Sequence, residues 1–81
     1  MLIDDIKIAI KKVLPDADVL IDGADGIHFQ AIVVSPSFTG LSLLKCQKLV
    51  KSSLSEFFQD GSLHALGLKT YTPEQWQSDQ P

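Results

Sequence analysis

The chain has 81 residues and a mass of 8.9 kDa, which is the size of one small domain. Its net charge is −3, all seven of its basic residues are lysines, and it has two histidines and one cysteine, Cys46. One cysteine excludes a disulfide scaffold, and one Cys with two His is too few ligands for a zinc finger. Without arginine the chain lacks the forked donors on which sequence-specific DNA reading relies. A domain this small has a thin core, which favours a binding role over catalysis in a deep cavity.

No export signal or membrane span is expected. The first 14 residues, MLIDDIKIAIKKVL, carry charges throughout, unlike the apolar stretch of a signal peptide or a spanning helix. A thiol without a partner is typical of a reducing compartment. We therefore expect a cytoplasmic protein.

The first element is an amphipathic helix over residues 2–14. Apolar residues recur there at helical spacing and predict a buried stripe of Leu2, Ile3, Ile6, Ile10, Val13 and Leu14. Acidic residues in its first turn and lysines in its last turn complement the helix dipole. Pro15 ends the helix, because the residue before a proline is disfavoured in helical geometry.

A hairpin follows, with strands over residues 19–21 and 29–34. The turn between them, residues 22–26, is rich in Gly and Asp. Alternation along the second strand places Phe29, Ala31 and Val33 on the face that meets the helices. His28 lies at the junction of loop and strand and points away from Phe29.

The next helix begins behind a turn-rich connector, residues 35–40, with Ser42 as its N-cap. Residues 43–57 form a helical stripe that ends near Gly61, and Ser52-Ser53 suggests a break into two helices. The predicted buried stripe is Leu43, Cys46, Val50, Leu54 and Phe57. The lysines of this segment lie on its polar side or border: Lys45, Lys48 and Lys51.

Residues 63–69 are predicted as a third strand and residues from Thr72 as a short helix. Thr72 is its N-cap, Pro73 its first residue and Gln75 the capping-box partner, while Trp76 faces back toward the domain. We therefore expect one α+β domain over residues 1–77 and a frayed tail over residues 78–81.

Three motifs resemble the BolA family, most closely its short YrbA-like branch. The first is DGIHFQ at residues 25–30, the second FTGLS at residues 38–42, similar to the family's F-x-G-x-S. The third is LHAL at residues 63–66 followed by KTYTPEQW at residues 69–76, similar to the family's I-H-A-L and T-P-E-x-W. Their order and spacing cover most of residues 1–77.

The resemblance implies a fold like the class II KH domain, with a three-stranded mixed sheet packed by helices in the order α-β-β-α-α-β-α. It also implies a partnership with a monothiol glutaredoxin that carries a CGFS motif. In that family the two proteins share a [2Fe–2S] cluster, to which the glutaredoxin contributes its cysteine and a glutathione thiol. The BolA protein contributes a histidine, here His64, and a loop His or Cys, here His28; alone it is expected to hold no cofactor.

Each candidate also has a simpler interpretation. From the residues alone, His64 suits a histidine held by a backbone hydrogen bond, and His28 suits a surface loop residue. Cys46 is expected to be a buried small hydrophobe. In many relatives basic residues occupy the positions of Leu41, Leu43 and Cys46, so an anion-binding role for this helix is in doubt here.

The preferred function is a non-enzymatic adaptor in iron–sulfur cluster assembly, trafficking or iron homeostasis. The alternative is a KH-like transcriptional regulator of stress response and cell morphology that binds nucleic acid through Lys45, Lys48 and Lys51. Three lysines on a protein of net charge −3 neutralise few phosphates, so any such binding should be weak. A homodimer stays open as a further association.

Overall fold

A computed structural model describes residues 3–23, 28–63 and 65–79 of the chain. The helices and strands are α1 (Ile3–Val13), β1 (Asp18–Asp22), β2 (His28–Val34), the 3-10 helix η1 (Pro36–Phe38), α2 (Leu43–Ser53), α3 (Ser55–Gln59), β3 (Ala65–Tyr71) and α4 (Pro73–Asp79). This order confirms the predicted α+β fold. Within the described part of the chain, no helix is long and apolar enough to cross a membrane.

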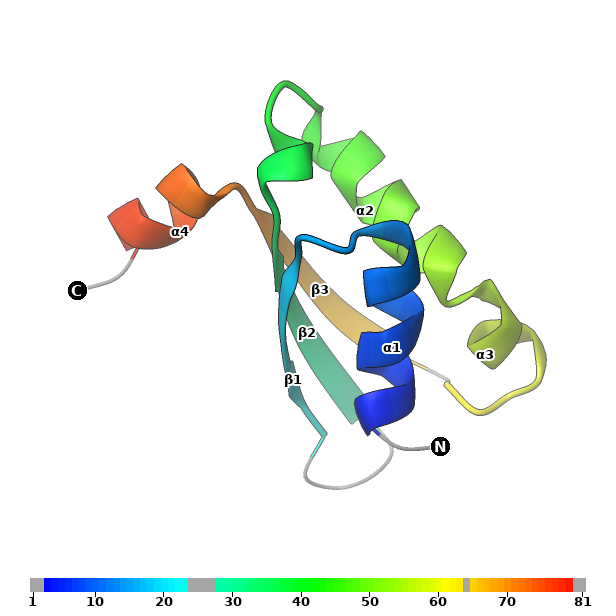
Figure 1. Cartoon of the computed structure of the whole chain (residues 1–81). Helices are drawn as coiled ribbons and strands as arrows, with labels where there is room; N and C mark the ends of the chain where they lie inside the picture. The colour runs from blue at the N-terminus through cyan, green and yellow to red at the C-terminus, as the bar shows by residue number, and fades with distance from the viewer. Residues whose placement is uncertain (1–2, 24–27, 64, 80–81) are drawn as a thin grey trace.

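The three strands form one mixed sheet in the order β1-β2-β3. β1 and β2 are antiparallel, whereas β2 and β3 are parallel. Helices α1, α2 and α3 lie on one side of the sheet, and α4 projects from the end of β3 (Figure 1). The central strand alternates as predicted from His28 to Val33, with Phe29, Ala31 and Val33 buried and His28 and Gln30 exposed, but Val34 at its end is also buried.

Helix α1 packs on the sheet through the predicted stripe, with one correction. Ile6 and Ile10 are fully buried and Leu14 is almost so, but Val13 is 44% exposed. Val13 lies at the edge of the stripe, where it borders a hollow beside Ser53 rather than the sheet. Leu2 lies outside the described residues.

The long helical segment breaks at Leu54, directly after the serine pair. The Ser52 and Ser53 hydroxyls donate to the carbonyls of residues 49 and 50, a pattern that competes with the helix ladder. Leu54 then caps α2 and is fully buried. The prediction that Leu43 belongs to the buried stripe is wrong, because this residue, the first of α2, is 64% exposed. It overhangs the sheet there and borders a hollow beside Tyr71.

The third strand starts and ends two residues later than predicted. Leu63 belongs to the loop after α3, because its backbone N–H donates to the carbonyl of Phe57 at 3.0 Å. The parallel register continues to Tyr71, which is opposite Val34. Beyond it α4 continues to Asp79, so residues 77–79 are helical, whereas Gln80 and Pro81 lie outside the described residues.

Both predicted helix caps are confirmed. Thr72 and Gln75 form a reciprocal capping box, with backbone N–H to side-chain oxygen distances of 3.0 and 3.2 Å. Trp76 turns back onto Tyr71, with ring centroids 5.2 Å apart. The Ser42 hydroxyl accepts from the backbone N–H of Lys45, and Gly40 precedes it with a φ of 82°, which favours glycine.

A hydrogen-bond network that the sequence did not reveal ties the turn after α1 to the end of β2. The Asp16 carboxylate accepts from the hydroxyls of Ser35 at 2.7 Å and Ser37 at 2.8 Å. Ser35 is fully buried, and its backbone N–H donates to the carbonyl of Tyr71. The network therefore joins the α1–β1 turn to the ends of both β2 and β3.

We predict that the stability gained from Asp16 depends on pH. The hydrogen bonds from Ser35 and Ser37 hold the pKa of this carboxyl below its usual value of 3.8. A lowered folded-state pKa contributes stability that is complete above the usual value and is lost as pH falls through the folded-state pKa. Asp16→Ala should therefore lower the melting temperature at pH 7 and lower it less at pH 3.

Thermal unfolding followed by circular dichroism at both pH values checks this. Ser37→Ala is the matched control, because it removes one of the two donors and should give a smaller loss at pH 7. An equal effect of Asp16→Ala at both pH values would contradict the prediction.

Candidate functional site

Two parallel strands begin side by side at one end of the sheet, which we call the histidine end. His28 is the first residue of β2, Ala65 is the first residue of β3, and the two are register partners. The His28 side chain is exposed and lies on the opposite side of its strand from the buried ring of Phe29, as predicted. The imidazole therefore lies at the protein surface, at the start of the central strand.

The other predicted ligand, His64, lies outside the described residues. In the sequence it directly precedes Ala65, the first residue of β3, which the structure does describe. In the residues for which the structure gives positions, no group of three or more His, Cys, Asp or Glu could hold a metal ion. The predicted ligand roles of His28 and His64 therefore stay predictions.

Cys46 is not part of the histidine end. It is buried in the core on α2, and its thiol is 4.0 Å from the carbonyl oxygen of Phe38, in the connector after the far end of β2. The prediction that it packs as a small hydrophobe is confirmed. A thiol in this position is shielded from a ligand at the surface.

Gly23 and Phe29 fix the two ends of the hairpin loop against the core. A Cβ atom added to Gly23 would overlap the Phe29 ring, so only glycine allows this close approach. Phe29 is buried and is the register partner of Leu66 on β3. From the sequence, Gly23 is predicted only as part of a turn; its position directly after β1 is the signal that could have indicated the packing role.

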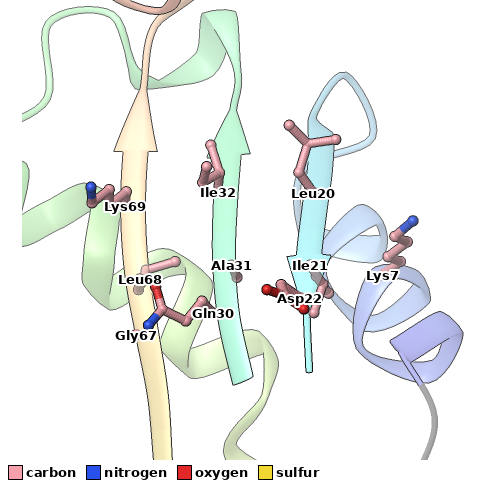
Figure 2. A pocket seen from close by; sticks show the side chains of 10 residues that line it. All are labelled: Lys7, Leu20, Ile21, Asp22, Gln30, Ala31, Ile32, Gly67, Leu68 and Lys69. Carbon is pink, nitrogen blue, oxygen red and sulfur yellow. The ribbon is translucent and has the colours of Figure 1, made fainter. Parts of the chain in front are cut away.

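The sheet face that turns away from the helices contains a hollow of about 500 Å³ next to the histidine end. Figure 2 shows the residues that line it, which come from all three strands and, through Lys7, from α1, with Gln30 extending toward Gly67 on β3. Its described side chains on this face are both polar and apolar: Leu20, Asp22, Gln30, Ile32 and Lys69. His28, Gln30 and Ile32 share one face of β2, so the hollow continues the surface beside His28.

The predicted nucleic-acid-binding lysines lie on α2 and are all exposed: Lys45, Lys48 and Lys51. They are not part of the histidine end, because α2 covers one side of the sheet and the exposed His28 lies on the side of β2 opposite the buried Phe29. The exposed leucines near them were not predicted from the sequence. Leu44 is 61% exposed and Leu41 is 37% exposed.

Comparison with known proteins gives consistent matches. The family model described as BolA-like protein matches residues 11–75. The acid stress protein IbaG of Escherichia coli K12 is 44% identical over 55 residues, which span 68% of this chain and 66% of IbaG, just under two thirds of its length.

Solved structures agree. A BolA protein homologue from Coxiella burnetii matches with a TM-score of 0.80 and 38% identity, over 95% of this chain and 97% of that one. The BolA domain of SufE1 from Arabidopsis thaliana matches with a TM-score of 0.76 and 29% identity, over 88% of this chain and 91% of that one.

We predict that Gly23→Ala destabilises the protein, because the added methyl group overlaps the Phe29 ring. Overpacking of this kind costs about 1–3 kcal/mol of unfolding free energy. Gly67→Ala is the matched control, since a Cβ there meets the Gln30 side chain at an ordinary 3.5 Å. Urea denaturation of both variants checks the difference, and equal stabilities would show that the Gly23 contact carries no constraint.

Proposed function

This chain belongs to the BolA family, and from that premise we propose that it is a non-enzymatic adaptor for a monothiol CGFS glutaredoxin. In the proposed complex the two proteins share a bridging [2Fe–2S] cluster, with His64 and His28 as the ligands from this chain and glutathione supplying a thiol beside the glutaredoxin cysteine. The adaptor acts in iron–sulfur cluster assembly, trafficking or iron homeostasis. A cytoplasmic location stays a prediction.

One observation carries the proposal: exposed His28 begins β2 opposite the strand position that follows His64. His64 directly precedes Ala65 in the sequence, and Ala65 is the register partner of His28. The parallel register thus pairs His28 with a strand residue 37 positions further along the chain. This supports a shared role for the two imidazoles.

The available donors also suit a shared site. Neutral imidazole nitrogen is a good iron ligand, and the only thiol of the chain is buried. Histidine in place of cysteine on one iron of a [2Fe–2S] cluster raises its reduction potential. This chain therefore fits the group with nitrogen donors, while thiolates must come from the partner.

The face beside His28 supports a protein partner rather than a small substrate. Leu20 is half exposed there, with Ile32 and Lys69 in the same cross-strand row. A shallow surface with apolar and polar side chains is typical of a transient protein interface. SufE1 of Arabidopsis thaliana contains a BolA domain, so this fold also occurs as one part of a larger protein.

Nucleic-acid binding through Lys45, Lys48 and Lys51 is the second proposal. Their exposure on one helix without acidic residues favours it. The exposed leucines among them disfavour it, because apolar side chains make no contact with phosphate. We therefore place it after the adaptor function.

We predict that His28→Ala and His64→Ala each abolish the change in the visible circular dichroism spectrum that this chain produces when mixed with cluster-loaded CGFS glutaredoxin and glutathione. The reason is the loss of one nitrogen donor from the shared site. The readout is the absorption and circular dichroism spectrum between 300 and 700 nm, recorded at a protein concentration of roughly ten micromolar.

Gln30→Ala is the matched control, because Gln30 is exposed on the same face of β2, two residues from His28. It should keep the wild-type spectrum. A wild-type spectrum for His64→Ala would refute the proposed cluster site, whereas a wild-type spectrum for His28→Ala alone would remove only His28 from the ligand set.

A further inference from the structure

The outward side of α2 combines exposed leucines with lysines, and we call this surface the leucine–lysine face. Its residues are Leu41, Leu44, Lys45 and Lys48. Leu44 is 61% exposed and Leu41 is 37% exposed, and both lysines are exposed as well. Apolar side chains that are clustered at the surface of a small protein mark a docking surface, whereas single exposed ones do not.

The face contains a shallow hollow of about 460 Å³. It is lined by Leu41, Lys45, Lys48, Leu49 and Ser52. The lining residues on α2, from Lys45 to Ser52, follow one side of the helix over seven positions, or about 10 Å at 1.5 Å per residue, and Leu41 lies in the connector before the helix. The hollow, which we call the groove, therefore runs along about two turns of α2 and suits about two turns of a second helix.

The charged side chains that line the groove are both positive. Helix α2 contains three lysines and neither Asp nor Glu, although the whole chain has a net charge of −3. The lysine stems add apolar surface to the groove while their ammonium groups remain at its rim. A complementary ligand presents apolar side chains toward the leucines and carboxylates toward the rim.

We propose that the leucine–lysine face binds an acidic amphipathic helix of a partner protein. Such a helix places apolar side chains at i, i+3 or i+4, and i+7 into a groove of this kind. An anionic membrane is less suitable, because membrane recruitment by charge uses clusters of about four to eight basic residues. A DNA duplex leaves the leucines without a partner.

The binding surface lies on the helical side of the sheet, whereas the exposed His28 is on the other side of β2, so the surface does not depend on the proposed cluster. Leu43, the first residue of α2, borders a hollow beside Tyr71, whereas His28 is opposite Ala65 at the start of β3. The seven residues of β3 separate these positions. A client helix on α2 and a cluster partner at His28 can therefore bind the same molecule together.

The test is a nuclear magnetic resonance titration of the ¹⁵N-labelled full chain. The probe is a synthetic amphipathic helical peptide built from Leu, Glu and Ala, and the reference is a peptide of the same composition with its leucines scattered around the helix. We expect saturable shifts confined to residues 41–52 with the amphipathic peptide and none with the scrambled one. Lys45→Glu with Lys48→Glu should weaken binding at least tenfold, and Leu41→Ser, which removes an exposed leucine that lines the groove, should weaken it about tenfold, as expected for losing roughly 1.4 kcal/mol each.

Matched controls separate the face from general charge and hydrophobicity. Lys11→Glu with Lys12→Glu makes the same charge change on the exposed end of α1, and Leu20→Ser removes a half-exposed leucine from the sheet. Both controls, and His28→Ala, should bind as the wild type does, and the dispersion of each spectrum verifies folding.

Four results would overturn the proposal. They are equal weakening by the controls, shifts centred away from α2, absence of saturable binding by the peptide, and binding to a 20-base-pair DNA duplex or to phosphatidylglycerol–phosphatidylcholine vesicles in preference to the peptide.

Discussion

The parallel pairing of β2 with β3 determines where both proposed surfaces of this molecule lie. A parallel partner cannot follow through a tight turn, so the chain must cross from the end of β2 back to the start of β3. Helices α2 and α3 supply that crossover and cover one face of the sheet (Figure 1). The crossover places the start of α2 near Tyr71 and leaves His28 and Ala65 at the opposite end. The start of α2 and the histidine end are separated by the length of β3, roughly 20 Å at about 3.3 Å per residue.

Both ends of the central strand are held by contacts that maintain this register. At one end Phe29 packs against Gly23, and at the other Ser35 binds Asp16 and the carbonyl of Tyr71. A shift of one residue would turn the buried face of β2 to the solvent, so the alternating pattern resists slippage along the whole strand. The two contacts add fixed points at its ends. The position of the exposed imidazole therefore depends on packing beneath it as well as on the loop that precedes it.

The features that could be predicted from the sequence are those that depend on residues close together in the chain. The capping box of Thr72 and the N-cap of Ser42 involve residues three positions apart, and the alternation along β2 follows from its own period. The exposure of Val13 and Leu43 was not predictable in this way, because it depends on where each helix extends past the sheet. Strand register is also a long-range property, and only the family resemblance associated the two histidines. The Asp16 network links segments about 20 residues apart, and neither segment shows it alone.

The histidine end and the leucine–lysine face each lack chemical groups that a partner would supply. The only thiol of the chain is buried with the core, so a surface site made by this chain has nitrogen donors without thiolates. On the leucine–lysine face, leucines that a larger protein would cover remain in water beside lysines that lack acidic neighbours on their helix. A domain of this size has too little interior to cover both surfaces itself. Two surfaces that need different chemistry from outside, held apart by one rigid sheet, suit a protein that connects two partners better than one that acts on a substrate alone.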